Sequence, residues 1–107
     1  MSRAKGKIGE DQALLFLQDR DFKVIDRNFY SRFGEIDLIA IKDETLHFIE
    51  VKSGKWDPVH QITPAKLKKI IKTAQIYLSK NRLDMEYCFD AVIVEDNEIN
   101  LIENITF

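Results

Sequence analysis

The chain has 107 residues, enough for one domain with a hydrophobic core and too few for two. With 45% hydrophobic and 32% charged residues, and few glycines and prolines, its composition is that of a soluble globular protein. The sequence contains no internal repeat, linker or low-complexity segment. The formal net charge of −2 argues against a generic nucleic-acid binder, although the distribution of the charges matters more.

Two further features bear on the compartment. Cys88 is the single cysteine, which excludes an internal disulfide and a cysteine-rich zinc site and fits a reducing cytoplasm. No apolar run approaches transmembrane length, and residues 1–7 lack the apolar core of a signal peptide. We therefore expect a cytoplasmic protein that makes no membrane contact.

Residues 7–19 are predicted to form the first helix, because Ala13, Leu14 and Leu17 fall on one apolar stripe. Glu10 lies on the same stripe near the helix N-terminus, where the helix dipole favours an anion. It is either a carboxylate directed into the protein or one at the rim of the stripe that reaches water. The pattern does not decide between these two.

Residues 34–53 are predicted to form a β-hairpin, since two runs rich in isoleucine, leucine and valine flank a polar break at 42–45. With a two-residue loop at 43–44, the numbers of opposed residues sum to 87, so that Asp37 faces Glu50. Two carboxylates held roughly 5 Å apart across strands repel each other. Such a pair needs a compensating cation or a shared proton.

The two faces of this hairpin differ. One face is apolar except for His47, which we expect to be a packed histidine in the core-facing row. The other is apolar towards the turn and charged at the open end, where Glu35 faces Lys52 beside the carboxylate pair. The first face is predicted to contain Ile36, Leu38, Ala40, Ile49 and Val51.

A second helix is predicted from Thr63, as N-cap, through Pro64 to about Lys80. It follows a segment, 53–62, that is punctuated by glycine and proline and leaves directly from the charged end of the hairpin. Loops in such positions commonly contact substrate. The apolar stripe of this helix is Leu67, Ile70, Ile71, Ala74, Tyr77 and Leu78.

Three further strands complete the predicted sheet. They are residues 21–30, a buried strand at 87–95, and a final edge strand at 98–106 that follows a turn at 96–97. Asp90 in the buried strand is either a group that supports the site or a capped core carboxylate, and the sequence leaves this open.

The predicted order is αβββαββ, an α/β domain with a mixed sheet flanked by helices, covering residues 1–107. A single helix joins the third and fourth strands. These two strands can therefore lie parallel through a right-handed crossover.

Asp37 with Glu50-Val51-Lys52 is the strongest functional signal. Hard divalent cations bind carboxylate oxygens, and Mg²⁺ typically takes one or two from the protein. Lys52 could orient or deprotonate a metal-bound water, or stabilise developing charge. The alternative is a structural salt-bridge cluster that joins Glu35 to Lys52, with Asp37 near an arginine. The matched register and the apolar surroundings favour the metal site.

Seven short motifs spread over nearly the whole chain carry a family resemblance. They are Gly9-Glu10, Asn28-Phe29-Tyr30, GEIDLIA at 34–40, FIEVK at 48–52, Thr63-Pro64-x-Lys66, Ala74-Gln75-x-Tyr77-Leu78 and FDAV at 89–92.

As a set, these motifs resemble the YraN-like family of small bacterial proteins. Asp37 with Glu50-x-Lys52 also resembles the PD-(D/E)xK nuclease superfamily, which has the restriction-endonuclease-like fold. The resemblance implies a fold related to archaeal Holliday-junction resolvases, with a Mg²⁺ (or Mn²⁺) site. It implies Glu10, Asp37 and Glu50 as metal ligands and Lys52 as a further catalytic group. Beside them, we expect Glu35 to be a supporting acid, because it faces Lys52.

Two departures from the family pattern matter. Ile36 precedes Asp37 where the superfamily has a proline. Gly54 stands where the family usually has an arginine shortly after the lysine, which weakens the expected phosphate contact.

The charges are polarised along the chain. Residues 58–83 hold six basic residues and no acidic one, whereas residues 84–107 hold seven acidic residues and no basic one. Lysines on the outer face of a helix are usually only solvated. Here, however, the segment 53–62 links them to the candidate metal site, which supports phosphate binding. We expect the acidic C-terminal third to face away from nucleic acid. The expected DNA contacts are Lys66, Lys68, Lys69 and Lys72.

Three functions are consistent with the sequence. The first is a metal-dependent phosphodiesterase that acts on DNA, branched DNA included. The second is a nucleic-acid-binding module on a nuclease fold without cleavage, and the third is a protein-interaction domain. A homodimer would suit cleavage of two strands, although the sequence shows no interface.

Overall fold

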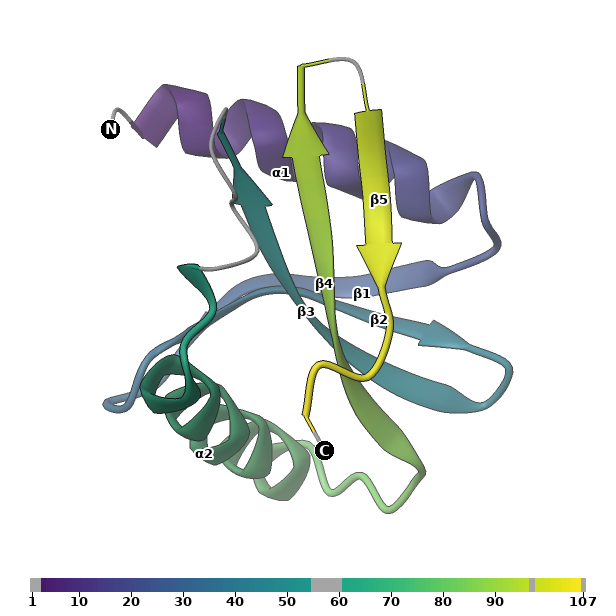
Figure 1. Cartoon of the computed structure of the whole chain (residues 1–107). Helices are drawn as coiled ribbons and strands as arrows, with labels where there is room; N and C mark the ends of the chain where they lie inside the picture. The colour runs from purple at the N-terminus through teal and green to yellow at the C-terminus, as the bar shows by residue number, and fades with distance from the viewer. Residues whose placement is uncertain (1–2, 55–60, 97, 107) are drawn as a thin grey trace.

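The computed structural model describes residues 3–54, 61–96 and 98–106 and has the predicted order αβββαββ (Figure 1). The two helices and five strands are α1 (Arg3–Gln18), β1 (Lys23–Tyr30), β2 (Glu35–Lys42), β3 (Thr45–Ser53), α2 (Pro64–Lys80), β4 (Tyr87–Glu95) and β5 (Glu98–Ile102).

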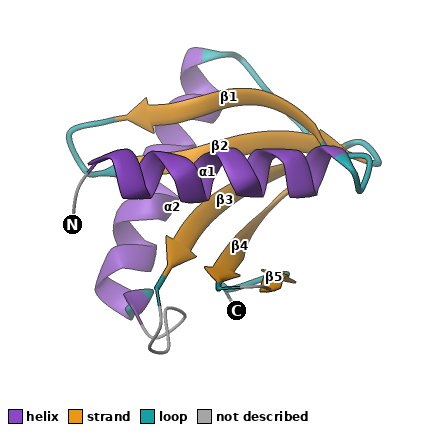
Figure 2. Cartoon of the chain, turned by 90° about the horizontal axis from the view of Figure 1, so that it is seen from above, coloured by secondary structure: helices purple, strands orange, loops and turns teal. Residues whose placement is uncertain are grey.

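The strands form one mixed sheet in the order β1-β2-β3-β4-β5. The pair β3–β4 is parallel, as expected for strands joined through a helix, and the other three pairs are antiparallel. The sheet lies between the helices, with α1 on one face and α2 on the other (Figure 2). This is a mixed α/β architecture consistent with the restriction-endonuclease-like fold.

Each helix covers its own apolar cluster. Under α1, the buried side chains of Ala13 and Leu17 pack with those of β2, β3 and β4, as the stripe in the sequence predicts. Under α2, the buried side chains of Ile70, Ala74 and Tyr77 pack on the opposite face. The central strands are therefore buried on both sides, which explains their nearly continuous apolar sequence.

The ends of α2 lie where the sequence predicts them. The Thr63 side chain accepts a hydrogen bond from the Lys66 backbone N–H at 3.3 Å, and Pro64 occupies the first turn. At the other end Asn81 is the C-cap, and its backbone N–H donates to the carbonyl of Tyr77 at 3.0 Å. Both caps use local groups, which is why sequence alone located them.

The β2–β3 hairpin turns through Asp43 and Glu44, which both have positive φ, of 50° and 63°. Positive φ at both central residues is the type I′ geometry that matches the twist of paired strands. This two-residue loop gives the predicted register, in which opposed residues sum to 87, from the Lys42–Thr45 pair onwards. The hairpin prediction is confirmed.

Strand β2 changes face at Asp37. Leu38 lies in the cluster under α1, but Ile36 lies in the cluster under α2. Across the β1–β2 ladder, Ile36 pairs with Phe29, which packs on the α2 cluster too and follows Asn28 at φ 52°. A left-handed residue in β1 rotates this end of the ladder. The prediction that Ile36 shares a face with Leu38 was therefore wrong.

The last strand is shorter than predicted, because β5 ends at Ile102 and residues 103–106 leave the sheet. The backbone N–H of Ile105 donates to the carbonyl of Phe89 at 2.8 Å, and the Ile105 side chain packs against the α2 cluster. Burial of this side chain outcompetes continued edge pairing. The sequence pattern of residues 98–106 does not reveal that the chain leaves the sheet edge to pack Ile105 against the α2 cluster.

Candidate metal centre

Asp37 and Glu50 meet at the open end of the hairpin. The β2–β3 pairing ends at Leu38 and Ile49, the neighbours of Asp37 and Glu50, and the two acids lie close enough for the charge of Asp37 to raise the pKa of Glu50. Here the Asp37 side chain accepts the Val51 backbone N–H at 2.8 Å. Both residues are buried, each with 8% of its surface exposed. The structure thus brings together the two acids that the sequence singles out.

Burial makes it costly to ionise both acids. Burial, then the charge of Asp37, raises the pKa of Glu50 to about 8. Burial also raises the pKa of Asp37 to about 7, with the charges of Glu10 and Glu35 adding to the effect and the Val51 hydrogen bond opposing it. Near neutral pH, the pair therefore retains a proton unless a cation replaces it.

Lys52 lies beside the pair, with Nζ 4.0 Å from Glu50 Oε2. Its charge lowers the pKa of both acids but does not outweigh burial. Among the ion pairs of the described residues, Lys52 is paired with Glu50 and not with Glu35. Glu35 affects the site through its charge, which raises the pKa of Glu50. The salt-bridge alternative, in the form predicted with a Glu35–Lys52 bridge, is absent from this part of the chain.

One oxygen of the site lacks a partner. Glu50 Oε1 is buried and accepts no hydrogen bond from the residues that the structure describes. A buried acceptor without a partner is costly, and such groups in native structures call for an explanation. A hard divalent cation held by Asp37 and Glu50 oxygens would satisfy it. The donor set therefore fits Mg²⁺ or Mn²⁺.

Glu10 approaches the pair from α1. Its side chain is 18% exposed, and its charge raises the pKa of Asp37. The preceding residue, Gly9, is buried against the end of β3, where an added Cβ would lie 3.3 Å from Ser53 Oγ. The absence of a side chain at Gly9 lets α1 pack this close and keeps Glu10 near the carboxylate pair.

Arg27 of β1 was not singled out from the sequence. Its Nη2 lies 2.8 Å from Asp11 Oδ1 and 3.6 Å from Glu10 Oε1, so it competes for the third acid of the site. Arg27 reaches α1 because it pairs with Leu38, which faces that helix. The only signal in the sequence was a basic residue within a partly apolar strand. Placing Arg27 at the site required the β1–β2 register.

The predicted DNA-binding lysines lie on the exposed surface of α2. Lys69 is adjacent to Gly34, in the loop between β1 and β2. Lys72 Nζ lies 5.0 Å from the centroid of the Phe33 ring in the same loop. The exposed set is Lys66, Lys68, Lys69 and Lys72.

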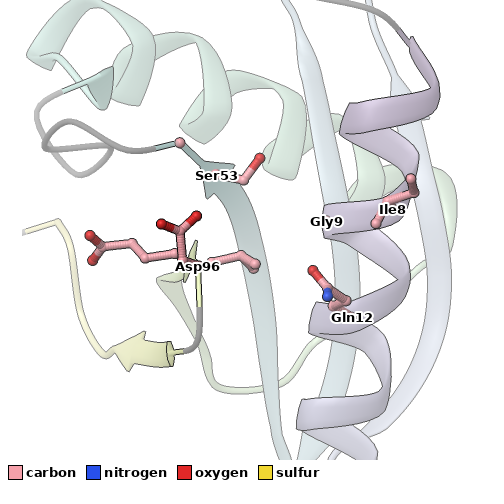
Figure 3. Close-up of a pocket in the computed structure, with 8 residues that line it drawn as sticks. Ile8, Gly9, Gln12, Ser53 and Asp96 are labelled. Carbon is pink, nitrogen blue, oxygen red and sulfur yellow. The ribbon is translucent and has the colours of Figure 1, made fainter.

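Part of the acidic C-terminal third lies nearer the site than expected. Glu95 and Asp96 line a pocket with Gly9 of α1 and with Ser53 and Gly54, at the end of β3 (Figure 3). The parallel register causes this, because it pairs Ser53 with Val94. Most of the loop predicted at 53–62 lies outside the described residues.

Comparison with known proteins adds the family. The family model described as "Uncharacterised protein family UPF0102" matches residues 9–94. The chain belongs to the UPF0102 family. The resemblance stated from its motifs is thereby confirmed.

Several UPF0102 proteins match over the whole length. A UPF0102 protein of Wolinella succinogenes is 54% identical over 107 residues, with 99% of each chain covered. One from Helicobacter pylori strain HPAG1 is 53% identical over 106 residues, covering 98% of this chain and 93% of the relative. One from Helicobacter hepaticus is 49% identical, with 98% and 96% covered. Their names state no activity, so the function of this UPF0102 chain must be argued from its site.

No helix within the described parts of this UPF0102 chain is both long and apolar enough to cross a membrane.

Proposed function

We propose that this UPF0102 protein is a divalent-metal-dependent endonuclease that hydrolyses phosphodiester bonds in DNA, branched DNA included. The observation that carries the proposal is the buried pair Asp37–Glu50, which has an unpartnered Glu50 oxygen and Lys52 beside it. Two ionised acids buried side by side destabilise a fold unless a bound cation compensates their charge. Their cost therefore argues for a functional site.

Asp37 and Glu50 would hold the metal ion, and Glu10 would complete the carboxylate set from α1. A bound Mg²⁺ or Mn²⁺ would polarise the phosphoryl oxygens and lower the pKa of a coordinated water. The buried position keeps bulk water from competing for the two acids. Arg27 Nη2, 3.6 Å from Glu10 Oε1, would orient the Glu10 carboxylate near the site and would weaken the binding of the metal ion by Glu10.

Lys52 would act on the phosphate. Its ammonium group is anchored near Glu50, on a rigid strand paired with β4 on one side. A fixed positive charge there would stabilise the negative charge that develops on the phosphoryl oxygens and would orient the attacking water. Its side chain is 22% exposed, which leaves it open to a substrate.

The lysines of α2 would bind the DNA backbone. Lys66 and Lys69 are exposed at the N-terminal half of the helix, and Lys72 lies over the ring of Phe33 beside them. Exposed ammonium groups bind phosphates by displacing condensed counterions. Because Glu95 and Asp96 repel phosphates at the β4 tip, DNA would approach from the α2 side.

The test is cleavage of linear and branched DNA in Mg²⁺ or Mn²⁺, with EDTA as the metal-free arm. Glu50→Gln should lower the rate at least about 100-fold. Glu44→Gln, at the exposed hairpin turn, is the matched control and should leave the rate unchanged. Thermal unfolding of both variants would verify that they fold.

Cleavage that survives EDTA, or that Glu50→Gln retains at the wild-type rate, would refute the proposed chemistry. Salt-dependent DNA binding with no cleavage in either metal would instead indicate the alternative, a non-catalytic nucleic-acid-binding module.

A further inference from the structure

A second group of metal-ligating side chains lies on the α1 face of the sheet. His47 of β3 pairs with Cys88 of β4 in the parallel register, and Asp90 follows two residues later on the same face of β4. The first candidate site lies apart from this group, around Asp37 and Glu50 at the open end of the hairpin. None of these three residues takes part in the proposed cleavage.

The potential ligand atoms converge. His47 Nδ1 lies 2.5 Å from Asp90 Oδ2 and 3.0 Å from Cys88 Sγ. Cys88 Sγ lies 3.7 Å and 3.9 Å from the two Asp90 oxygens. One nitrogen, one sulfur and one oxygen ligand atom thus lie within 4.8 Å of one another.

We propose that His47, Cys88 and Asp90 form a second metal site, for a borderline-soft divalent transition-metal ion such as Zn²⁺. A thiolate and an imidazole select such ions over Mg²⁺, which prefers oxygen ligands. Around tetrahedral zinc, ligand atoms are about 3.3 to 3.8 Å apart. The 3.7 Å separation of Cys88 Sγ from Asp90 Oδ1 already matches, and a small rotation of the His47 ring would widen its distances to Cys88 and Asp90.

The charges balance when the ion binds. Burial, then the Asp90 carboxylate, raises the pKa of Cys88 to about 12, so the metal-free thiol is neutral. Binding replaces the S–H bond with an S–metal bond and releases the thiol proton to solvent. His47 binds through the Nδ1 lone pair as neutral imidazole, with its proton on Nε2. One thiolate and one carboxylate then neutralise the divalent ion.

Neighbouring groups hold the ligands in place. Asp90 is fully buried, and its Oδ1 accepts the Asn104 backbone N–H at 3.0 Å. The edge of the Phe22 ring packs on the His47 ring, with centroids 4.9 Å apart. Such outer contacts fix the orientation of ligands in metal sites.

The site has a route to solvent and a place for a fourth ligand. The His47 side chain is 14% exposed and Cys88 is partly exposed, so an ion can enter from their side. A water molecule can supply the fourth position, as in zinc sites with three protein ligands. A bound ion would tie β3 to β4.

The experiment titrates the full-length protein with Co²⁺ as a spectroscopic substitute for Zn²⁺, in a non-thiol reductant. Because Cys88 is the only cysteine, thiolate-to-cobalt charge-transfer absorption reports this site alone. We expect the absorption to saturate at one Co²⁺ per chain and to disappear when Zn²⁺ is added. It should be lost in Cys88→Ser and weakened at least about tenfold in affinity in His47→Gln.

A control separates the two sites. Glu50→Gln should keep the cobalt absorption, so failure of the cleavage proposal leaves this one intact. In the wild type, free Zn²⁺ at about 100 times its dissociation constant should lower the unfolding equilibrium constant about 100-fold, and Cys88→Ser should lose that effect.

Absence of the charge-transfer absorption in wild-type protein would overturn the proposal, whatever the variants do. An absorption of unchanged affinity in a folded His47→Gln variant would also overturn it.

Discussion

Replacing Glu50 with glutamine should stabilise the metal-free protein strongly at alkaline pH, and by no more than about 1 kcal/mol near pH 5. Burial raises the pKa of this acid from its ordinary 4.5 to about 8. Since the folded pKa lies above the unfolded one, the unfolded chain releases the proton first. Wild-type stability should therefore fall as pH rises from about 4.5 to about 8, and then level off.

The magnitude follows from the pKa. One pKa unit corresponds to about 1.4 kcal/mol, so ionising Glu50 in the folded protein costs roughly 5 kcal/mol in full, with roughly 3 kcal/mol already lost at about pH 7. Asp37 remains in the variant, but it then titrates without a charged neighbour at position 50. The difference between the two stability profiles therefore reports the ionisation of the coupled pair.

The assay is urea unfolding at about pH 5, 7 and 9, first without metal and then in Mg²⁺. The free energies of unfolding should be similar at the lowest pH and favour Glu50→Gln at the highest. Mg²⁺ should restore wild-type stability most at high pH, because it binds the ionised pair, and should do little for the variant. Profiles that run parallel across this range would refute the reasoning.

Three other substitutions test separate parts of the structure. Replacing Lys66 and Lys69 with glutamine should weaken DNA binding for all sequences alike, and should flatten the slope of log affinity against log salt by about one unit per lost phosphate contact. The control Lys23→Gln, near the far end of the hairpin, should change neither. An unchanged slope in the double variant would show that these lysines are only a solvated face. Arg27→Met should tighten Mg²⁺ binding roughly fivefold in a calorimetric titration, because a competing cation worth roughly 1 kcal/mol is removed; weaker binding would contradict that role. Thr63→Ala should cost about 1 kcal/mol in urea unfolding through the lost N-cap bond, with Thr63→Ser close to wild type.

The parts of the fold that could be predicted from the sequence depend on residues close together in the chain. The cap of α2 depends on Thr63 and its near neighbours, and the hairpin register depends on a two-residue turn. Because the turn sets the register up to Leu38 and Ile49, the closeness of Asp37 to Glu50 could be predicted from the sequence, although the change of face at Asp37 could not.

Features that depend on distant elements were out of reach. Arg27 joined the site only through the β1–β2 ladder, and Ile36 changed cluster because Asn28 in another strand adopts positive φ. His47 and Asp90 could be recognised as partners only once the parallel register of β3 and β4 was known. No spacing within one segment encodes these contacts.

The change of face in β2 has a consequence for when the protein can act. Asp37 stands between Ile36, which enters the cluster under α2, and Leu38, which enters the cluster under α1. A chain in which only one face has packed leaves one flanking residue unanchored, and the acid pair is then not held in register. If the protein is the endonuclease proposed above, it would bind its metal only after the clusters under both helices had packed. It would therefore not cleave DNA during its own synthesis.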